Sequence, residues 1–171
     1  MTHRPSGIAM VAALLIAIGG CTSGAGTSGG APTTRGASTT ASASSITIAP
    51  GDRAACASLY ARLQQVTATL DASAELIASS LSKQELSARI AAEQEQLRRS
   101  AESMAQGAVP APLVTADKQL VAALRALTAD FGRARGPAAR GDFKAAAQAM
   151  TDAAVVKRIV DASKTIEDAC T

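Results

Sequence analysis

The chain contains few of the side chains on which enzymes and nucleic-acid-binding proteins depend. Of its 171 residues only one is a histidine, none is a tryptophan, and the aromatic residues are Tyr60, Phe131 and Phe143. So few rings cannot form the stacking platform that holds bases or sugars. Residues 52–171 carry 15 basic and 14 acidic residues, so the pI near 9.0 gives no evidence for nucleic-acid binding. We expect no nucleic-acid partner.

The scarcity of histidine also restricts the catalytic and metal-binding chemistry that this chain can support. The single histidine, His3, lies in an N-terminal segment that we expect to be removed. Ser/His/Asp and Cys/His nucleophile arrangements need an imidazole base, and di-iron sites in helical bundles use Glu-x-x-His pairs. The sequence therefore predicts a protein that is not an enzyme and that has no cofactor or metal. Four acidic residues that could be considered as ligands are predicted to lie on solvated helix faces: Glu93, Glu95, Glu102 and Asp130.

The N-terminus has the pattern of a secretory signal peptide. A short basic segment with Arg4 precedes an apolar run from Ile8 to Ile18, which is too short for a membrane-spanning helix of about 20 residues. The run ends in Ile18-Gly19-Gly20-Cys21.

This tetrapeptide resembles the lipobox of bacterial lipoproteins, which is an aliphatic residue, two small residues and a cysteine. The resemblance implies that residues 1–20 are a lipoprotein signal peptide and that Cys21 carries a diacylglycerol. Cys21 would then anchor the protein to the outer face of the cell membrane. The alternative is an ordinary signal peptide cut nearby, with Cys21 unmodified. The whole chain is similar in composition to small alanine-rich lipoproteins of mycobacteria and related actinobacteria, but residues 52–171 resemble no specific family.

Residues 21–51 form the next segment, which is rich in Gly, Ser, Thr, Ala and Pro and has a single charged residue, Arg35. Such a composition cannot bury enough apolar surface to fold and is typical of a flexible linker. We therefore expect a lipidated cysteine and a disordered tether that holds the following domain above the membrane.

From Asp52 onward apolar residues recur every three or four positions, as in amphipathic helices. The segment Ser82 to Glu85 has the sequence of a capping box, which marks a helix start, and Asp142 is a plausible N-cap. The glycines and proline of residues 132–141 indicate a loop. We expect an all-α domain over 52–171 that forms an antiparallel up-down-up-down four-helix bundle, with helices at about 53–80, 83–106, 115–133 and 142–169.

The remaining cysteines bear on this topology. Cys56 lies near the start of the first predicted helix and Cys170 near the end of the last. The compartment outside the membrane is oxidising, which favours a disulfide. In a four-helix bundle both positions lie at the same end, as a disulfide requires, whereas one long helix over 53–106 would separate them by tens of ångströms. The alternative is a pair of free buried thiols.

One basic cluster has no evident structural role. Arg133, Arg135 and Arg140 lie in the predicted loop, with no acidic residue between them and none until Asp142. The topology places this loop at the end of the bundle opposite the tether, near Lys83. The main interpretation is a solvated, mobile loop; the alternative is that Arg133, Arg135 and Arg140 contact an anionic envelope polymer or an acidic protein partner.

These observations leave two functions. The first is a non-enzymatic interaction or structural module of the cell envelope, and the second is a carrier or sensor of a small apolar ligand between the helices. An apolar cavity of several hundred Å³ would favour the carrier, and a filled core would favour the module.

Overall fold

A computed structural model of the chain describes residues 46–78 and 81–171. All regular secondary structure in those two stretches is helical, which confirms the prediction of an all-α fold. The elements are the short 3-10 helix η1 (Pro50–Asp52), α2 (Arg53–Ala78), α3 (Lys83–Gln106), the 3-10 helix η2 (Ala111–Leu113), α4 (Val114–Arg140), α5 (Phe143–Met150) and α6 (Ala153–Cys170).

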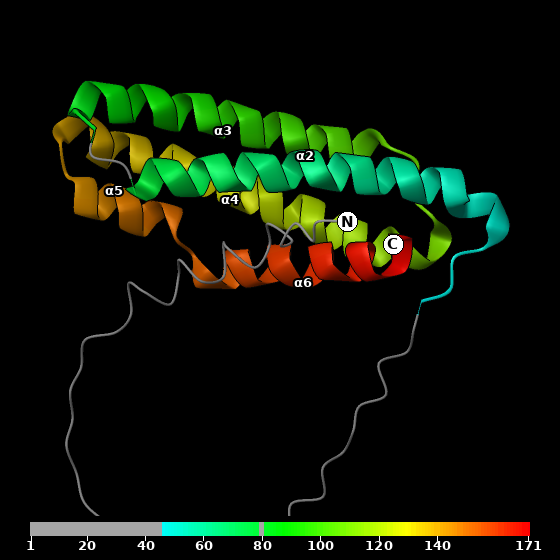
Figure 1. The fold of residues 1–171 in the computed structure, drawn as a ribbon. Coiled ribbons are helices and arrows are strands. Elements are labelled where there is room, and N and C mark those ends of the chain that lie inside the picture. Colours follow the sequence, from blue (N-terminus) through cyan, green and yellow to red (C-terminus); the bar gives the residue numbers. More distant parts are fainter. Residues whose placement is uncertain (1–45, 79–80) are drawn as a thin grey trace, which may run out of the picture.

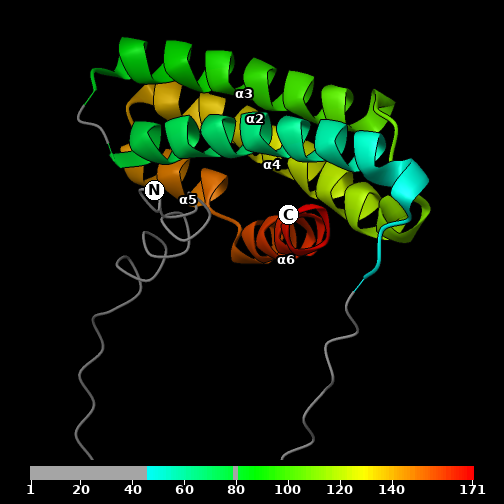
Figure 2. The same ribbon diagram turned by 45° about the vertical axis from the view of Figure 1, so that its right-hand side comes forward.

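Three long helices lie side by side, and the two C-terminal helices pack against them (Figures 1 and 2). α3 contacts both α2 and α4, while α6 contacts α2 and α4 from the other side. The short helix α5 packs against α4 near the end where α2 ends and α3 begins. The fourth side of the molecule is therefore shared by α5 and α6.

The core between the helices is built from leucine, isoleucine, valine, methionine and alanine, with one phenylalanine and one cysteine. Because alanine is small, the helices approach closely, and large side chains fill the remaining space. The largest fully buried apolar side chains are Phe131, Leu59, Leu63, Ile90, Leu97, Met104, Leu113, Leu120, Leu124, Ile166 and Val66.

The contact between α2 and α3 is partly polar, which the apolar pattern does not indicate. Beyond Val66 the buried positions of α2 include Thr69 and Ser73, whereas Leu70 is only partly buried. The Thr69 hydroxyl lies 3.3 Å from that of Ser100 on α3, and Ser73 donates to the backbone oxygen of Thr69 over 3.0 Å. These hydroxyls are satisfied within the interface, so their burial costs little.

The start of α3 is as predicted. Ser82 has extended backbone angles, its hydroxyl accepts a hydrogen bond from the Glu85 backbone N–H, and the Glu85 carboxylate accepts from the Ser82 N–H over 3.0 Å. This is a complete capping box. The hydrogen bonds to Ser82 hold the pKa of Glu85 below its ordinary value, as expected for a carboxylate that caps a helix.

The predicted loop at 132–141 is wrong, because α4 continues through these residues to Arg140. Gly132 lies beside the Gln94 side chain of α3, and a Cβ there would be 2.9 Å from Gln94 Nε2. The helix ends at Gly141, which has the positive φ of 80° that glycine accepts readily. Its N–H donates to the Ala138 oxygen and that of Asp142 donates to the Pro137 oxygen, both over 3.0 Å. The two bonds form a Schellman C-cap.

The single helix predicted at 142–169 is also wrong, because the chain breaks between Met150 and Ala153. The Asp152 side chain accepts hydrogen bonds from the backbone N–H groups of Ala154 and Val155, over 2.8 and 3.1 Å. Asp152 is therefore the N-cap of α6. Phe143, the first residue of α5, is 47% exposed.

Candidate interaction site

The three arginines singled out by the sequence lie on the C-terminal part of α4 and not in a loop. Arg133 forms an ion pair with the buried Asp130 on the same helix. Arg140 lies back along the helix, with Nη1 about 3.5 Å from where a Cβ on Gly136 would be. Arg135 is exposed and lines a groove. The structure thus divides the predicted cluster into one paired arginine and two that make no salt bridge with the described residues.

The groove beside Arg135 runs between the start of α3 and the end of α4. It is open to solvent and has a volume of about 410 Å³. We call it the α3–α4 groove. It is lined by Lys83, Gln84, Ser87, Ala88 and Ala91 on α3 and by Arg135 and Ala139 on α4. The expected proximity of the basic cluster to Lys83 is therefore confirmed for Arg135.

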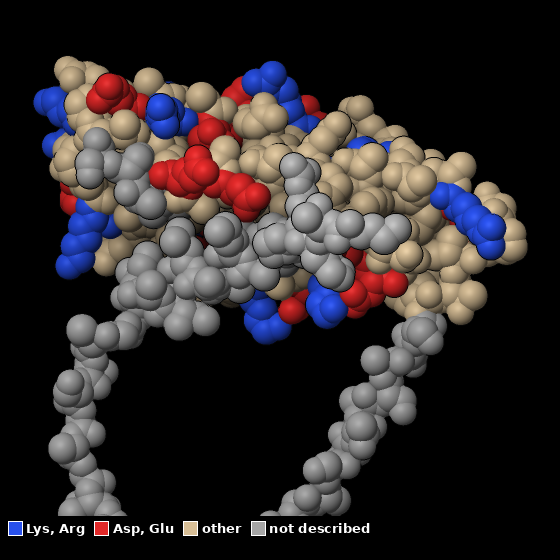
Figure 3. Space-filling view, viewed as in Figure 1, with Lys and Arg blue, Asp and Glu red and all other residues tan. Residues whose placement is uncertain are grey.

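The end of the molecule that holds the groove has an excess of positive charge. Figure 3 shows basic side chains gathered at the left-hand end, where α5 lies. Four acidic residues near this end are engaged within the protein, namely Glu85 in the capping box, Asp130 with Arg133, Asp142 as N-cap of α5 and Asp152 as N-cap of α6. Glu75, in the last turn of α2, is exposed but does not line the groove. The basic side chains in the groove are therefore left to interact with an external anion.

Asp130 is one of two buried acids on α4, and its burial contradicts the predicted solvated position. Asp130 is 1% exposed and Asp117 is 7% exposed. Burial raises the pKa of both carboxyl groups above their ordinary value, although Arg133 opposes this shift in Asp130 and Arg62 opposes it in Asp117. Each group has one oxygen without a hydrogen-bond partner among the described residues. Burial of Asp130 could have been inferred from the small and apolar residues one and two turns away on the same helix face, Ala123, Leu127, Ala134 and Ala138.

The two acids do not form a metal centre. Within residues 46–78 and 81–171, no three His, Cys, Asp or Glu side chains are grouped so that they could hold a metal ion. Glu95 and Glu102 instead form ion pairs with Arg98 along α3. A hydrogen bond from Arg98 holds the pKa of Glu95 below its ordinary value.

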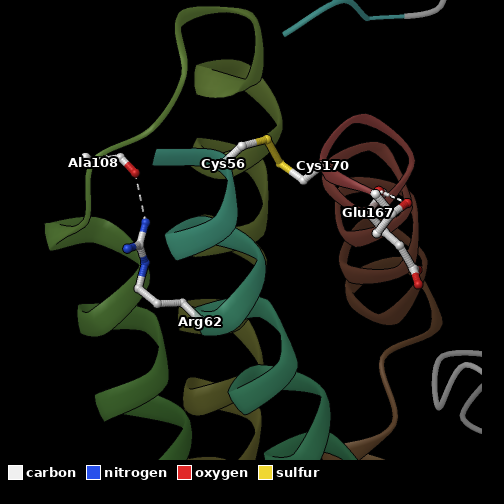
Figure 4. Close-up of a disulfide and its surroundings, with 6 residues drawn as sticks. Cys56, Arg62, Ala108, Glu167 and Cys170 are labelled. Carbon is white, nitrogen blue, oxygen red and sulfur yellow. Dashed lines mark hydrogen bonds between the residues drawn. A yellow bond between two sulfur atoms is a disulfide. The ribbon is translucent and has the colours of Figure 1, made fainter. Parts of the chain in front are cut away.

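The opposite end of the molecule is held by a disulfide. Cys56, near the start of α2, and Cys170, the last residue of α6, are joined with their Cα atoms 5.5 Å apart, as the sequence predicted (Figure 4). In the same region Arg62 of α2 donates a hydrogen bond of 3.0 Å to the backbone oxygen of Ala108, which follows α3. A Cβ on Gly107 would lie 1.9 Å from the Arg62 guanidinium carbon, so this contact requires glycine.

An apolar cavity lies between α2, α4 and α6. It has a volume of about 40 Å³ and is lined by Thr67, Leu70, Leu127, Val156, Ile159, Val160 and Ser163. A water molecule occupies about 30 Å³ in the liquid, so this space is close to the size of a single water. It is far smaller than the 300–1,000 Å³ of ordinary small-molecule sites.

The predicted lipidation residue, Cys21, and the rest of the lipobox lie outside the described residues. None of the described helices is both long enough and apolar enough to cross a membrane. Compared with protein-family models, with curated proteins and with solved structures, the chain has no match.

Proposed function

We propose that this chain is a lipid-anchored lipoprotein on the outer face of the cell membrane, where its helical domain acts as a non-enzymatic interaction or structural module of the cell envelope. The anchor is a diacylglycerol on Cys21, and two acyl chains are enough for durable attachment without a membrane-spanning helix.

In this proposal the helices form an antiparallel up-down-up-down bundle whose fourth position is shared by α5 and α6. The neighbour relations support this arrangement, since α2 and α4 each contact α3 on one side and α6 on the other. The disulfide supports it as well, because it joins the start of the first helix to the end of the last.

The observation that favours a module over a carrier is the close packing of the core among the described residues. The apolar space between α2, α4 and α6 measures about 40 Å³, and large side chains such as Phe131 and Leu124 are fully buried around the helix contacts. A carrier of an apolar ligand would need a cavity several times larger. The α3–α4 groove, which a partner could contact, lies on the surface.

The position of the groove also supports a module. The described chain begins beside the disulfide, while the α3–α4 groove lies where α3 begins and α4 ends. A tether before Pro50 would therefore hold the disulfide end toward the membrane and the basic end away from it. Such an orientation presents the groove to other envelope components.

Native mass spectrometry of the protein extracted from its own membrane tests this proposal. We expect the native mass to equal the denatured mass, and we expect both to include the acyl chains. A C21S variant, which keeps the rest of the chain unchanged, should lose the acyl mass. A native mass excess that disappears on denaturation would identify a bound ligand and would favour the carrier, whereas an unmodified Cys21 would contradict the anchor.

A further inference from the structure

We propose that the α3–α4 groove binds an acidic amphipathic segment of a partner protein. This inference rests on the proposed function as an interaction module and assigns that function to a site. The segment would place acidic side chains against Lys83 and Arg135 and small apolar side chains against the alanines between them.

The first argument is the charge of the two walls. Lys83 comes from α3 and Arg135 from α4, so the groove has a basic side chain from each helix. Neither forms a salt bridge with any described residue. Neighbouring acids do not neutralise them, because Glu85 caps α3 and Asp142 caps α5. A ligand carboxylate would therefore meet two cations that have no internal partner.

The second argument is the surface between these cations. Ala88, Ala91 and Ala139 present only methyl groups, which allow another backbone to approach closely. A phosphate polymer or a polyanion without apolar groups gains nothing from such a surface, whereas an amphipathic peptide buries its own apolar side chains on it. Charge and shape together favour an acidic amphipathic segment over a bare anionic polymer.

The third argument is that polar groups are available to fix the orientation of the segment. The side chains of Gln84 and Ser87 line the groove and make no hydrogen bond within the described part of the chain. An amide and a hydroxyl can each donate and accept. A bound segment could therefore use them for its backbone groups, in addition to its two charge contacts.

The groove is also held in a fixed shape by helix caps on both of its walls. The capping box fixes the first turn of α3, and the positive φ of Gly141 ends α4 directly after Arg140. Binding would therefore require little ordering of the protein backbone, which lowers the entropic cost of association.

The test uses the full chain in dodecyl maltoside and a fluorescein-labelled peptide of four Glu-Leu-Ala-Ala repeats, with binding followed by fluorescence anisotropy at low salt. We compare the K83Q/R135Q variant with the matched control K118Q/R125Q, which removes the same charge from exposed positions of α4. The A139L variant fills the groove without changing charge or helix propensity. Circular dichroism checks that each variant is folded.

An exposed ion pair contributes about 0.2–1 kcal/mol, so the loss of two pairs should weaken binding by about 2- to 30-fold. We therefore expect this loss for K83Q/R135Q, at least about a threefold loss for A139L by steric exclusion, and less than about a twofold change for K118Q/R125Q. Equal losses in the two double variants would overturn the inference, because binding would then follow net charge alone.

Competition with unlabelled poly-glutamate and with polyphosphate of equal charge distinguishes the kinds of ligand. We expect the amphipathic peptide to compete more strongly than either. Stronger competition by polyphosphate, together with an unaffected A139L variant, would replace the acidic segment by an anionic polymer and refute this inference. Either negative result leaves the native masses unchanged, so failure of the groove is distinguishable from failure of the module.

Discussion

Loss of the Cys56–Cys170 disulfide should strongly destabilise the domain. The bond closes a loop with a sequence separation of 114 residues, so it removes much of the conformational freedom of the unfolded chain. The chain-entropy relation gives a stabilisation of about 5 kcal/mol for a loop of this length. Typical domains have an unfolding free energy of about 5–15 kcal/mol, so the disulfide is expected to supply a large share of the total.

The assay is urea unfolding of the full chain, followed by far-UV circular dichroism with and without reductant. We expect the oxidised protein to be more stable by about 3–5 kcal/mol than the C56A/C170A variant, allowing for strain in the native state. The single variant C170A is the control, since it also lacks the bond but keeps the buried Cys56 side chain. Reduced wild type should behave like both variants. A difference below about 1 kcal/mol would refute the reasoning from loop closure.

Three further predictions concern the buried acid and the two ends of α3. Because burial raises the pKa of Asp130 above its ordinary value of 3.8, the folded state binds the proton more tightly, and stability falls as pH rises from about 4 through the raised pKa. A D130N variant should lose the part of this fall that Asp130 contributes and keep the part from Asp117, whose pKa burial also raises. Urea unfolding between about pH 3 and 7 would show the smaller fall, and parallel pH profiles of stability would contradict the buried charge. The S82A variant lacks the capping box, so its free energy of unfolding should be lower by about 1 kcal/mol. Thermal unfolding measures this loss, and an unchanged midpoint temperature would contradict a stabilising role of the cap. The G107A variant displaces the Arg62 guanidinium, so its free energy of unfolding should be lower by about 1 kcal/mol. In an R62A background the same substitution should cost much less, because the hydrogen bond from Arg62 to the Ala108 oxygen is already absent.

The parts of the fold that could be predicted from sequence are those set by local signals. The capping box at Ser82 predicted the start of α3, and the predicted range of 83–106 agrees with the helix that Gly107 caps at its C-terminal end. The pairing of Cys56 with Cys170 followed once four helices and an oxidising compartment were inferred. Each of these signals acts within a few residues or through a covalent bond, so distant packing does not override it.

The errors lie where tertiary packing outweighs local propensity. Gly and Pro cost about 1 and 3 kcal/mol in a helix interior, yet α4 continues past Gly132 and Pro137. Three side chains in this part of the helix are fully buried, namely Phe131, Ala134 and Ala138. Helix α4 packs against α3 and α5, and this packing stabilises the helical conformation. This packing could not be read from the chain before the neighbouring helices were placed.

The break between α5 and α6 was missed for a different reason, since a local signal was present. Asp152 precedes Ala153 as an N-cap, but the apolar pattern from Phe143 to Ile166 suggested one continuous helix.

The α3–α4 groove could also be predicted only in part. Arg135 was identified, but Ala88 and Ala139 meet only because the start of α3 lies beside the end of α4.

The disulfide has a mechanical consequence. Cys56 lies just after the point where the chain enters α2, and Cys170 is the last residue of α6. Tension applied to the segment before Pro50 therefore reaches α2 and α6 together, through a covalent link. Residues 57–169, which include nearly all of α2 and α6 as well as α3, α4 and α5, lie inside the closed covalent loop and outside this load path. Force applied between the chain before Cys56 and the chain after Cys170 passes through the disulfide and cannot extend the residues between the two cysteines, so the helical domain keeps its length under load.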